Sequence, residues 1–210
     1  MPTGPLPSPL LSVRDLHFAW PHGVLFDSLS FELPPGVSLV QGDDGSGKST
    51  LLALLAGERV AQRGNLQVGG TALHEAPDDY RRQVFWIDPQ TDAFDAISAS
   101  AWLGSVAPRY PAFRADVLAE LIEGFALAPH LDKPMYMLST GSKRKVWLRA
   151  GFAAGAPLTL IDQPFAALDG PSMRFLRTLL QEAAEHPTRA WLLADHAAPD
   201  GVPLARVINL

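Results

Sequence analysis

A glycine-rich loop between a strand-like run and a helix-like run constrains the fold of this chain most strongly. The run Val37–Val40 is short and apolar, as in a buried strand, and Leu51–Ala56 followed by Gly57 has the pattern of a helix with its stop signal. Between them, the segment GDDGSGKST at residues 42–50 has every fixed position of the P-loop pattern. This order of strand, loop and helix predicts an α/β domain with a site for nucleotide phosphates.

The types of residue in the loop suit that site. Successive backbone N–H groups and a helix N-terminus face bound phosphates, Lys48 is expected to reach the outer phosphates, and the Ser49 hydroxyl is expected to ligate Mg²⁺. Carboxylates at Asp43 and Asp44 oppose a polyanion unless they point to solvent, which is the orientation we expect. The predicted phosphate-binding residues are Gly42, Asp43, Asp44, Gly45, Ser46, Gly47, Lys48, Ser49 and Thr50.

Composition limits the class of protein. The chain has 210 residues, which is enough for one well-buried domain and too few for two independent ones. It has no cysteine, which excludes disulfides and thiol catalysis and agrees with a reducing, cytoplasmic location. No uncharged apolar run approaches the roughly 20 residues that span a bilayer. The net charge of −5 opposes a broad positive field, so no nucleic-acid partner is expected.

The order of the patterns predicts one domain with an insertion. Alternating runs at 11–14 and 25–33 predict an N-terminal antiparallel β-subdomain, and residues 1–9 are expected to be a flexible leader ahead of a single domain at 10–210. Strand signals vanish over about 92–137, where apolar spacing follows a helical period. Further strand-like runs lie at 64–70, 84–87, 158–161, 190–194 and 207–208, with a helix-like run at 173–185. The fold class predicted is therefore α/β, with a P-loop core and an inserted helical subdomain.

A second nucleotide motif ends one of these strands. The apolar run Leu158–Ile161 is followed by Asp162, in the place where P-loop enzymes keep the carboxylate that holds the Mg²⁺ shell. Any buried strand can end in Asp, so this pattern gains its meaning from the loop at 42–50.

Four further segments add to these two motifs, and together they match the motif set of one known family. Gln90 follows the strand-like run at 84–87, the sequence LSTGS occupies residues 138–142, FAALD occupies 165–169, and His196 follows the run at 190–194. Together with the two nucleotide motifs, they make the chain resemble the ATP-binding cassette (ABC) ATPases, the nucleotide-binding subunits of ABC transporters. The resemblance covers nearly the whole chain from Leu11.

The resemblance implies roles for these residues, with ATP and Mg²⁺ as cofactors. It implies that Gln90 touches Mg²⁺ and the attacking water, and that His196 contacts the γ-phosphate. It implies that Asp169 couples the two sites of a dimer, and that Trp20 stacks on adenine. The residues implied to contact the γ-phosphate on the opposite subunit are Ser139, Thr140, Gly141 and Ser142. Read singly, these residues also fit a structural histidine, a turn before a helix and a core tryptophan.

The signature segment departs from the family pattern. Thr140 replaces a glycine at a point of close backbone approach, and Ser142 replaces a glutamine, which puts the strength of the contact across the dimer in question. The alternative is an ordinary helix that Ser139 caps, with the basic run 143–145 on its solvated face.

The residue after Asp162 is the most important departure. Gln163 stands where the family usually has a Glu that polarises the attacking water, and an amide cannot accept a proton. Loss of a positioned base typically lowers the rate by about 10² to 10⁴, so slow hydrolysis is expected. Gln163 fits a cassette that uses ATP as a switch or works beside a competent partner, and it equally fits a Glu-to-Gln substitution that traps bound ATP.

These observations lead to a functional expectation with alternatives. The chain is expected to energise a transmembrane ABC transporter subunit as a homodimer or heterodimer, on the inner face of the membrane, with the partner held in a groove beside Gln90 near Phe94 and Ile97. The main alternative is a regulatory or clamp module that binds ATP and barely hydrolyses it. A non-transport ABC protein of DNA repair or translation is disfavoured because the chain has neither a coiled-coil insertion nor tandem cassettes. A P-loop kinase of another family ranks last.

Overall fold

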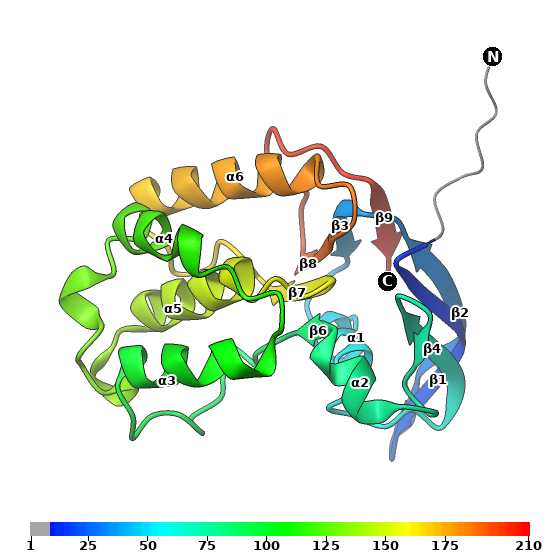
Figure 1. Ribbon diagram of the computed structural model, residues 1–210. Coiled ribbons are helices and arrows are strands. Elements are labelled where there is room, and N and C mark those ends of the chain that lie inside the picture. The colour runs from blue at the N-terminus through cyan, green and yellow to red at the C-terminus, as the bar shows by residue number, and fades with distance from the viewer. Residues whose placement is uncertain (1–8) are drawn as a thin grey trace.

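The computed structural model describes residues 9–210 and contains two β-sheets with helices packed around them (Figure 1). Residues 1–8 of the predicted leader lie outside the described residues. The smaller sheet is antiparallel with strand order β2-β1-β4-β5, and the larger is parallel with order β6-β7-β8-β3-β9. This α/β architecture confirms the predicted fold class.

The antiparallel sheet is formed mainly by the N-terminal part of the chain. Its strands are β1 (Leu11–Trp20), β2 (Gly23–Leu33), β4 (Arg63–Val68) and β5 (Thr71–Ala72). The alternation seen in the sequence appears as one buried face, which packs on the leucines of helix α1 (Lys48–Leu55). The P-loop therefore lies close to both sheets.

The parallel sheet carries helices on both faces. Its strands are β3 (Gly36–Gln41), β6 (Val84–Phe85), β7 (Leu158–Asp162), β8 (Ala190–Asp195) and β9 (Arg206–Asn209). Successive side chains of β8 alternate, so that Leu192 faces the core with α1, whereas Trp191 and Leu193 face the core with α6 (Gly170–Ala184). The helix α2 (Pro77–Arg82) connects the two sheets in the chain order.

Helices and short 3₁₀ turns occupy the stretch in which strand signals vanish. These helices are α3 (Ala99–Val106) and α4 (Leu118–Gly124), with 3₁₀ turns at Ala107–Arg109, Ala115–Val117, Ala128–His130 and Met135–Met137, and α5 (Thr140–Ala153) follows. In Figure 1 they gather on the side of the molecule away from the antiparallel sheet. The exact limits of the insertion, about 92–137, stay a prediction.

An aromatic cluster fixes this helical block. Trp102 of α3 packs edge-on against Trp147 of α5, with ring centroids 4.4 Å apart, and Phe94 lies 5.7 Å from the first and 6.0 Å from the second. The segment that follows Gln90 is thereby anchored to the helix that follows Ser139. Within residues 9–210, no helix has the length and apolar character needed to cross a membrane.

Candidate nucleotide site

Glycines give the loop between β3 and α1 its shape. Gly47 precedes α1 in the left-handed region at φ 102°, and a Cβ there would lie 3.0 Å from side-chain atoms of Leu25 and Phe26. A Cβ on Gly42 would lie 2.5 Å from the Ser46 Oγ. The loop is thus packed too tightly for side chains at these two positions, and the first N–H groups of α1 are left for a ligand.

Polar groups inside the loop suit a phosphate. Lys48 is buried, and its Nζ donates to the carbonyls of Gly42 and Asp43, each at 2.7 Å. The Ser46 Oγ is buried and has no hydrogen-bond partner within residues 9–210. Asp43 and Asp44 are exposed, and Asp44 also lines the depression around Lys48. An oxyanion would satisfy both the ammonium group and the unpartnered hydroxyl.

Hard oxygen ligands lie side by side at the end of β7. Burial raises the pKa of the Asp162 carboxyl group, while hydrogen bonding with Ser49 and the charges of Arg144 and Lys48 oppose the rise. No cluster of three or more His, Asp or Glu side chains suited to a metal occurs in the described part of the chain. A hydroxyl and a carboxylate fit Mg²⁺, which takes few protein ligands and completes its shell with phosphates and water.

Gln163 faces the same place. Its side chain is exposed and lines, with Trp20, Lys48 and Ser49, a depression of about 550 Å³. Its backbone has φ 45°, an uncommon value for a residue with a side chain, and its N–H donates to the Ala194 carbonyl at 2.8 Å. The residue that the sequence singled out therefore lies beside the predicted phosphate and Mg²⁺ ligands.

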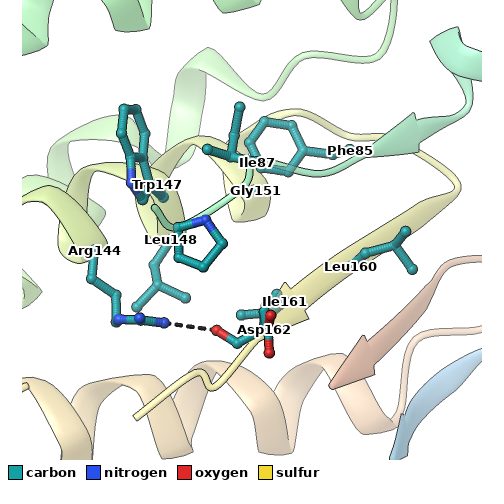
Figure 2. Close-up of a pocket in the computed structure, with 10 residues that line it drawn as sticks. Phe85, Ile87, Arg144, Trp147, Leu148, Gly151, Leu160, Ile161 and Asp162 are labelled. Carbon is teal, nitrogen blue, oxygen red and sulfur yellow. Dashed lines mark hydrogen bonds between the residues drawn. The ribbon is translucent and has the colours of Figure 1, made fainter. Parts of the chain in front are cut away.

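Sequence reasoning missed the part that Arg144 takes in shaping the end of β7. Arg144 and Lys145 were weighed as members of a solvated face, yet both are only 9% exposed, so that interpretation is wrong for them. Arg144 Nη1 donates to the carbonyls of Asp162 at 2.7 Å and Gln163 at 2.6 Å, and Figure 2 shows it reaching from α5 toward the end of β7. Burial lowers the pKa of this guanidinium. Arg144 thereby holds the left-handed turn at Gln163.

Gln90 and His196 lie outside the depression that Lys48 lines. Gln90 is exposed, and its N–H donates to the Asp88 carboxylate at 2.9 Å. It lines a separate depression of about 850 Å³ together with Thr140 and Arg144. The exposed His196 ring lies 2.6 Å from the Asp195 carboxylate, at the carboxyl end of β8. The structure thus places both on the nucleotide-facing edge of the sheet without bringing them into contact with Lys48 or Ser49.

The signature segment begins α5. Ser139 caps this helix, because its Oγ accepts from the Ser142 N–H at 3.1 Å, as predicted. A Cβ on Gly141 would lie 2.3 Å from the Ala167 carbonyl, so glycine is required where the following loop passes. Thr140 is exposed and lines the depression that contains Gln90. The segment lies apart from the depression that Lys48 lines.

Trp20 stands at the rim of that depression. The side chain is 38% exposed; its ring meets Phe18 edge-on at 5.1 Å, and the Arg59 guanidinium lies 4.6 Å from its centroid. It therefore combines partial packing with an accessible aromatic surface. Nothing in the sequence indicated that Arg59 would join it.

Asp169 ties α6 to α5. Its carboxylate caps α6 by accepting from the Ser172 N–H at 2.9 Å, and it pairs with Lys145 Nζ at 2.5 Å. These bonds, Lys145 first, hold the pKa of Asp169 well below its usual range. The stabilisation is therefore present above the unfolded-state pKa and is lost as the pH falls through the lowered folded-state value.

Asp169 variants are expected to separate the cap from the ion pair. Asp169→Asn keeps a capping oxygen and loses the charge, whereas Asp169→Ala loses both and is expected to be less stable than the Asn variant by about 1 kcal/mol. Urea unfolding at about pH 7 and about pH 2.5 measures this, with exposed Asp132→Asn as the control. Equal stability of the wild type and both variants would show that neither contact matters.

Known proteins share this arrangement over most of the chain. The profile of the ABC transporter family matches residues 26–166. The cobalt import ATP-binding protein CbiO of Rhodobacter capsulatus is 35% identical over 82% of this chain, which spans 65% of that protein's length. The cytochrome c biogenesis ATP-binding export protein CcmA of Pseudomonas putida KT2440 is 34% identical, over 89% of this chain and 90% of its own.

Solved structures agree with the sequence matches. The chain described as the ATP-binding subunit of an ABC transporter superposes with a TM-score of 0.80 at 27% identity, over 89% of this chain and 79% of its own. The family match covers more than half of the chain and includes the P-loop and Asp162. This chain therefore belongs to the ABC transporter family, as one of its ATP-binding ATPase subunits.

Proposed function

We propose that this subunit binds ATP with Mg²⁺ at the loop of residues 42–50 and energises a transmembrane ABC transporter subunit by ATP-driven closure of a dimer. The observation that carries the proposal is the convergence of Lys48, Ser49, Asp162 and Gln163 at the carboxyl edge of one parallel sheet. Ligands of open α/β sheets bind at this edge.

Each cofactor has an assigned place in this proposal. The α1 N-terminus and Lys48 hold the phosphates, Ser49 and Asp162 hold Mg²⁺ and Trp20 offers a face to adenine. Gln90 and His196 reach the γ-phosphate region only when a nucleotide is present, since neither lines the depression around Lys48. Bound Mg²⁺ supplies a positive charge that offsets charge on the transferring phosphoryl group.

The dimer follows from where the signature segment lies. Ser139 and Thr140 are exposed at the beginning of α5 and do not line the subunit's own phosphate depression. A helix N-terminus favours an anion, so a second subunit's γ-phosphate is its proposed ligand, with Asp169 beside it in the same interface. The second subunit is a copy of this chain or a related cassette.

Hydrolysis is proposed to be slow because Gln163 replaces a general base. Its amide can orient a water molecule and cannot take its proton. Gln163 also favours the second candidate function, a regulatory or clamp module in which ATP holds the dimer closed and turnover is incidental.

The partner surface is proposed to lie beside Gln90. Phe94 packs into the cluster with Trp102 and Trp147 and is half-buried, whereas Ile97 is 40% exposed and offers the larger accessible surface of the predicted pair. The location proposed is the cytoplasmic face of the membrane, through that partner. Because the relatives are named for cobalt import and for cytochrome c biogenesis export, we assign neither direction nor cargo.

Size-exclusion chromatography in Mg-ATP tests the proposal. We expect a monomer without nucleotide and a long-lived dimer in Mg-ATP. Ser139→Glu should prevent the dimer, because it sets a carboxylate against the phosphate, and exposed Ser100→Glu on α3 should leave it intact. A chain that binds ATP but stays a monomer would contradict the homodimer and favour a heterodimer, whereas failure to bind ATP would contradict the function itself.

A further inference from the structure

A second polar pocket lies at the end of the parallel sheet opposite to the nucleotide site. It has a volume of about 590 Å³ and opens between α4, the end of α5, the second half of α6 and the start of β8. Its lining includes Arg114, Phe152, Glu182, His186, Arg189 and Trp191. Nothing in the nucleotide mechanism uses these residues.

Arg189 carries a charge that the protein does not compensate. Its Nε donates to the Ala156 carbonyl at 2.9 Å and its guanidinium lies 4.5 Å from the Trp191 ring centroid, but Nη2 is buried without a hydrogen-bond partner within residues 9–210. Burial, and then the positive charge of Arg114, lower the pKa of Arg189 to about 10. Half-burying the Arg189 cation beside the Arg114 cation is unfavourable unless an anion binds next to them.

His186 offers a second donor in the same pocket. Its Nδ1 accepts from the backbone N–H groups of Thr188 at 3.3 Å and Arg189 at 3.1 Å, so the neutral ring carries its proton on Nε2. Burial, Arg189 and Arg114 together lower the pKa of His186, which keeps the ring neutral at neutral pH. The ring meets Trp191 edge-on, with centroids 5.5 Å apart.

The remaining charges of the pocket lie around this pair of donors. Arg114 pairs with Asp116 through bonds of 2.8 and 2.5 Å and remains half exposed. Glu120 and Glu182 also line the pocket, but neither forms an ion pair with Arg189 within residues 9–210. The carboxylates therefore leave the buried guanidinium unneutralised.

Aromatic rings form an apolar wall beside the donors. Phe152 and Trp191 lie nearly parallel, with ring centroids 6.3 Å apart and planes inclined by 25°. Trp191 is only 2% exposed and already carries the Arg189 guanidinium on its ring, so a planar apolar group would stack on Phe152. An attached anion can then reach the guanidinium, whose fork matches a carboxylate or phosphate.

We propose that this pocket binds a small organic anion, with its carboxylate or phosphate on the half-buried Arg189 guanidinium and the His186 Nε2–H, and its flat apolar part against Phe152. Arg114 adds positive charge at the rim. β8 joins this pocket to the nucleotide edge, and its six residues (Ala190–Asp195) place the two sites roughly 17 Å apart at about 3.3 Å per residue. A ligand here would contact both the helical block and the sheet, separately from ATP.

Isothermal titration calorimetry with benzoate, and with inorganic phosphate, tests this site at constant ionic strength with Mg-ADP present to occupy the P-loop. We expect saturable binding with one site per chain. Arg189→Lys keeps the charge and loses the fork, so binding should weaken at least about tenfold, and Arg114→Gln should weaken it severalfold. Arg82→Gln, which removes an exposed arginine of α2 far from the pocket in sequence, should bind as the wild type does.

Other outcomes overturn the proposal. The absence of saturable binding by either probe contradicts it, and so does binding that Arg189→Lys and Arg114→Gln both leave unchanged. Phosphate that Mg-ADP displaces is bound at the P-loop and also counts against the pocket. If circular dichroism shows that Arg189→Lys is unfolded, then Arg114→Gln and His186→Phe decide, since an unchanged affinity in both excludes the site.

Discussion

Replacing Gln163 by Glu is expected to raise ATP turnover by about 10² to 10⁴, because it supplies a general base at a position that already faces the phosphate site. Gln163 lines the depression that holds Lys48 and Ser49, and hydrogen bonds from its N–H to Ala194 and from Arg144 to its carbonyl fix its backbone. Glu is nearly isosteric with Gln, so we expect the same backbone conformation in the variant. The gain should appear in kcat, since the base acts on the attacking water.

Steady-state phosphate release at saturating Mg-ATP measures this effect. The matched control is Gln181→Glu, which makes the same change on the exposed face of α6 and should leave turnover unchanged. If Gln163→Glu alone turns over while the present chain forms a long-lived dimer in Mg-ATP, the amide is the block. Fast turnover by the present chain would refute this explanation. If neither chain hydrolyses ATP, Thr140 and Ser142 in the signature segment or a missing partner limits the reaction, and the clamp function gains support.

The parts of the fold that were predictable have strong local patterns. The P-loop strand and helix were recognised because a buried apolar run, fixed glycines and Lys48 follow in an order that few other structures use. The helix α1 begins at Lys48, earlier than the apolar run that predicted it, since the loop residues themselves form its first turn. Apolar spacing over about 92–137 predicted helix, and α4 (Leu118–Gly124) lies in that stretch; Ala126, in the left-handed region at φ 51°, follows its end.

What escaped prediction depends on contacts between distant segments. Arg144 and Lys145 lie in a basic run that is typical of a solvated face, yet carbonyls at the end of β7 and the Asp169 carboxylate draw them inward. The anion pocket joins Arg114, Phe152 and Arg189, which no local pattern relates. Site residues that belong to local motifs on strands and loops were therefore predictable from the sequence. Residues that come together only through tertiary packing were not.

Replacing Lys48 by Gln is expected to lower ATP affinity by about 10- to 100-fold. Lys48 is 7% exposed, and its ammonium group now rests on the Gly42 and Asp43 carbonyls at 2.7 Å. Phosphate oxygens would replace these neutral acceptors with charged ones, and a hydrogen bond to a charged group contributes about 1.5 to 3 kcal/mol, where each 1.4 kcal/mol is about tenfold in affinity. The net gain in binding free energy is the difference between the new bonds to phosphate and the Gly42 and Asp43 carbonyl bonds that Lys48 gives up.

Calorimetric titration with ATP separates this loss of binding from a loss of folding. The Gln amide can still donate to one loop carbonyl, so the free energy of unfolding without nucleotide should change far less than the affinity does. The exposed Lys133→Gln removes the same charge and should bind ATP as the wild type does, which excludes an effect of net charge alone. An unchanged affinity in Lys48→Gln would mean that backbone N–H groups and Mg²⁺ ligands hold the phosphates without the lysine, and the chain would then differ from its family at the motif that defines it.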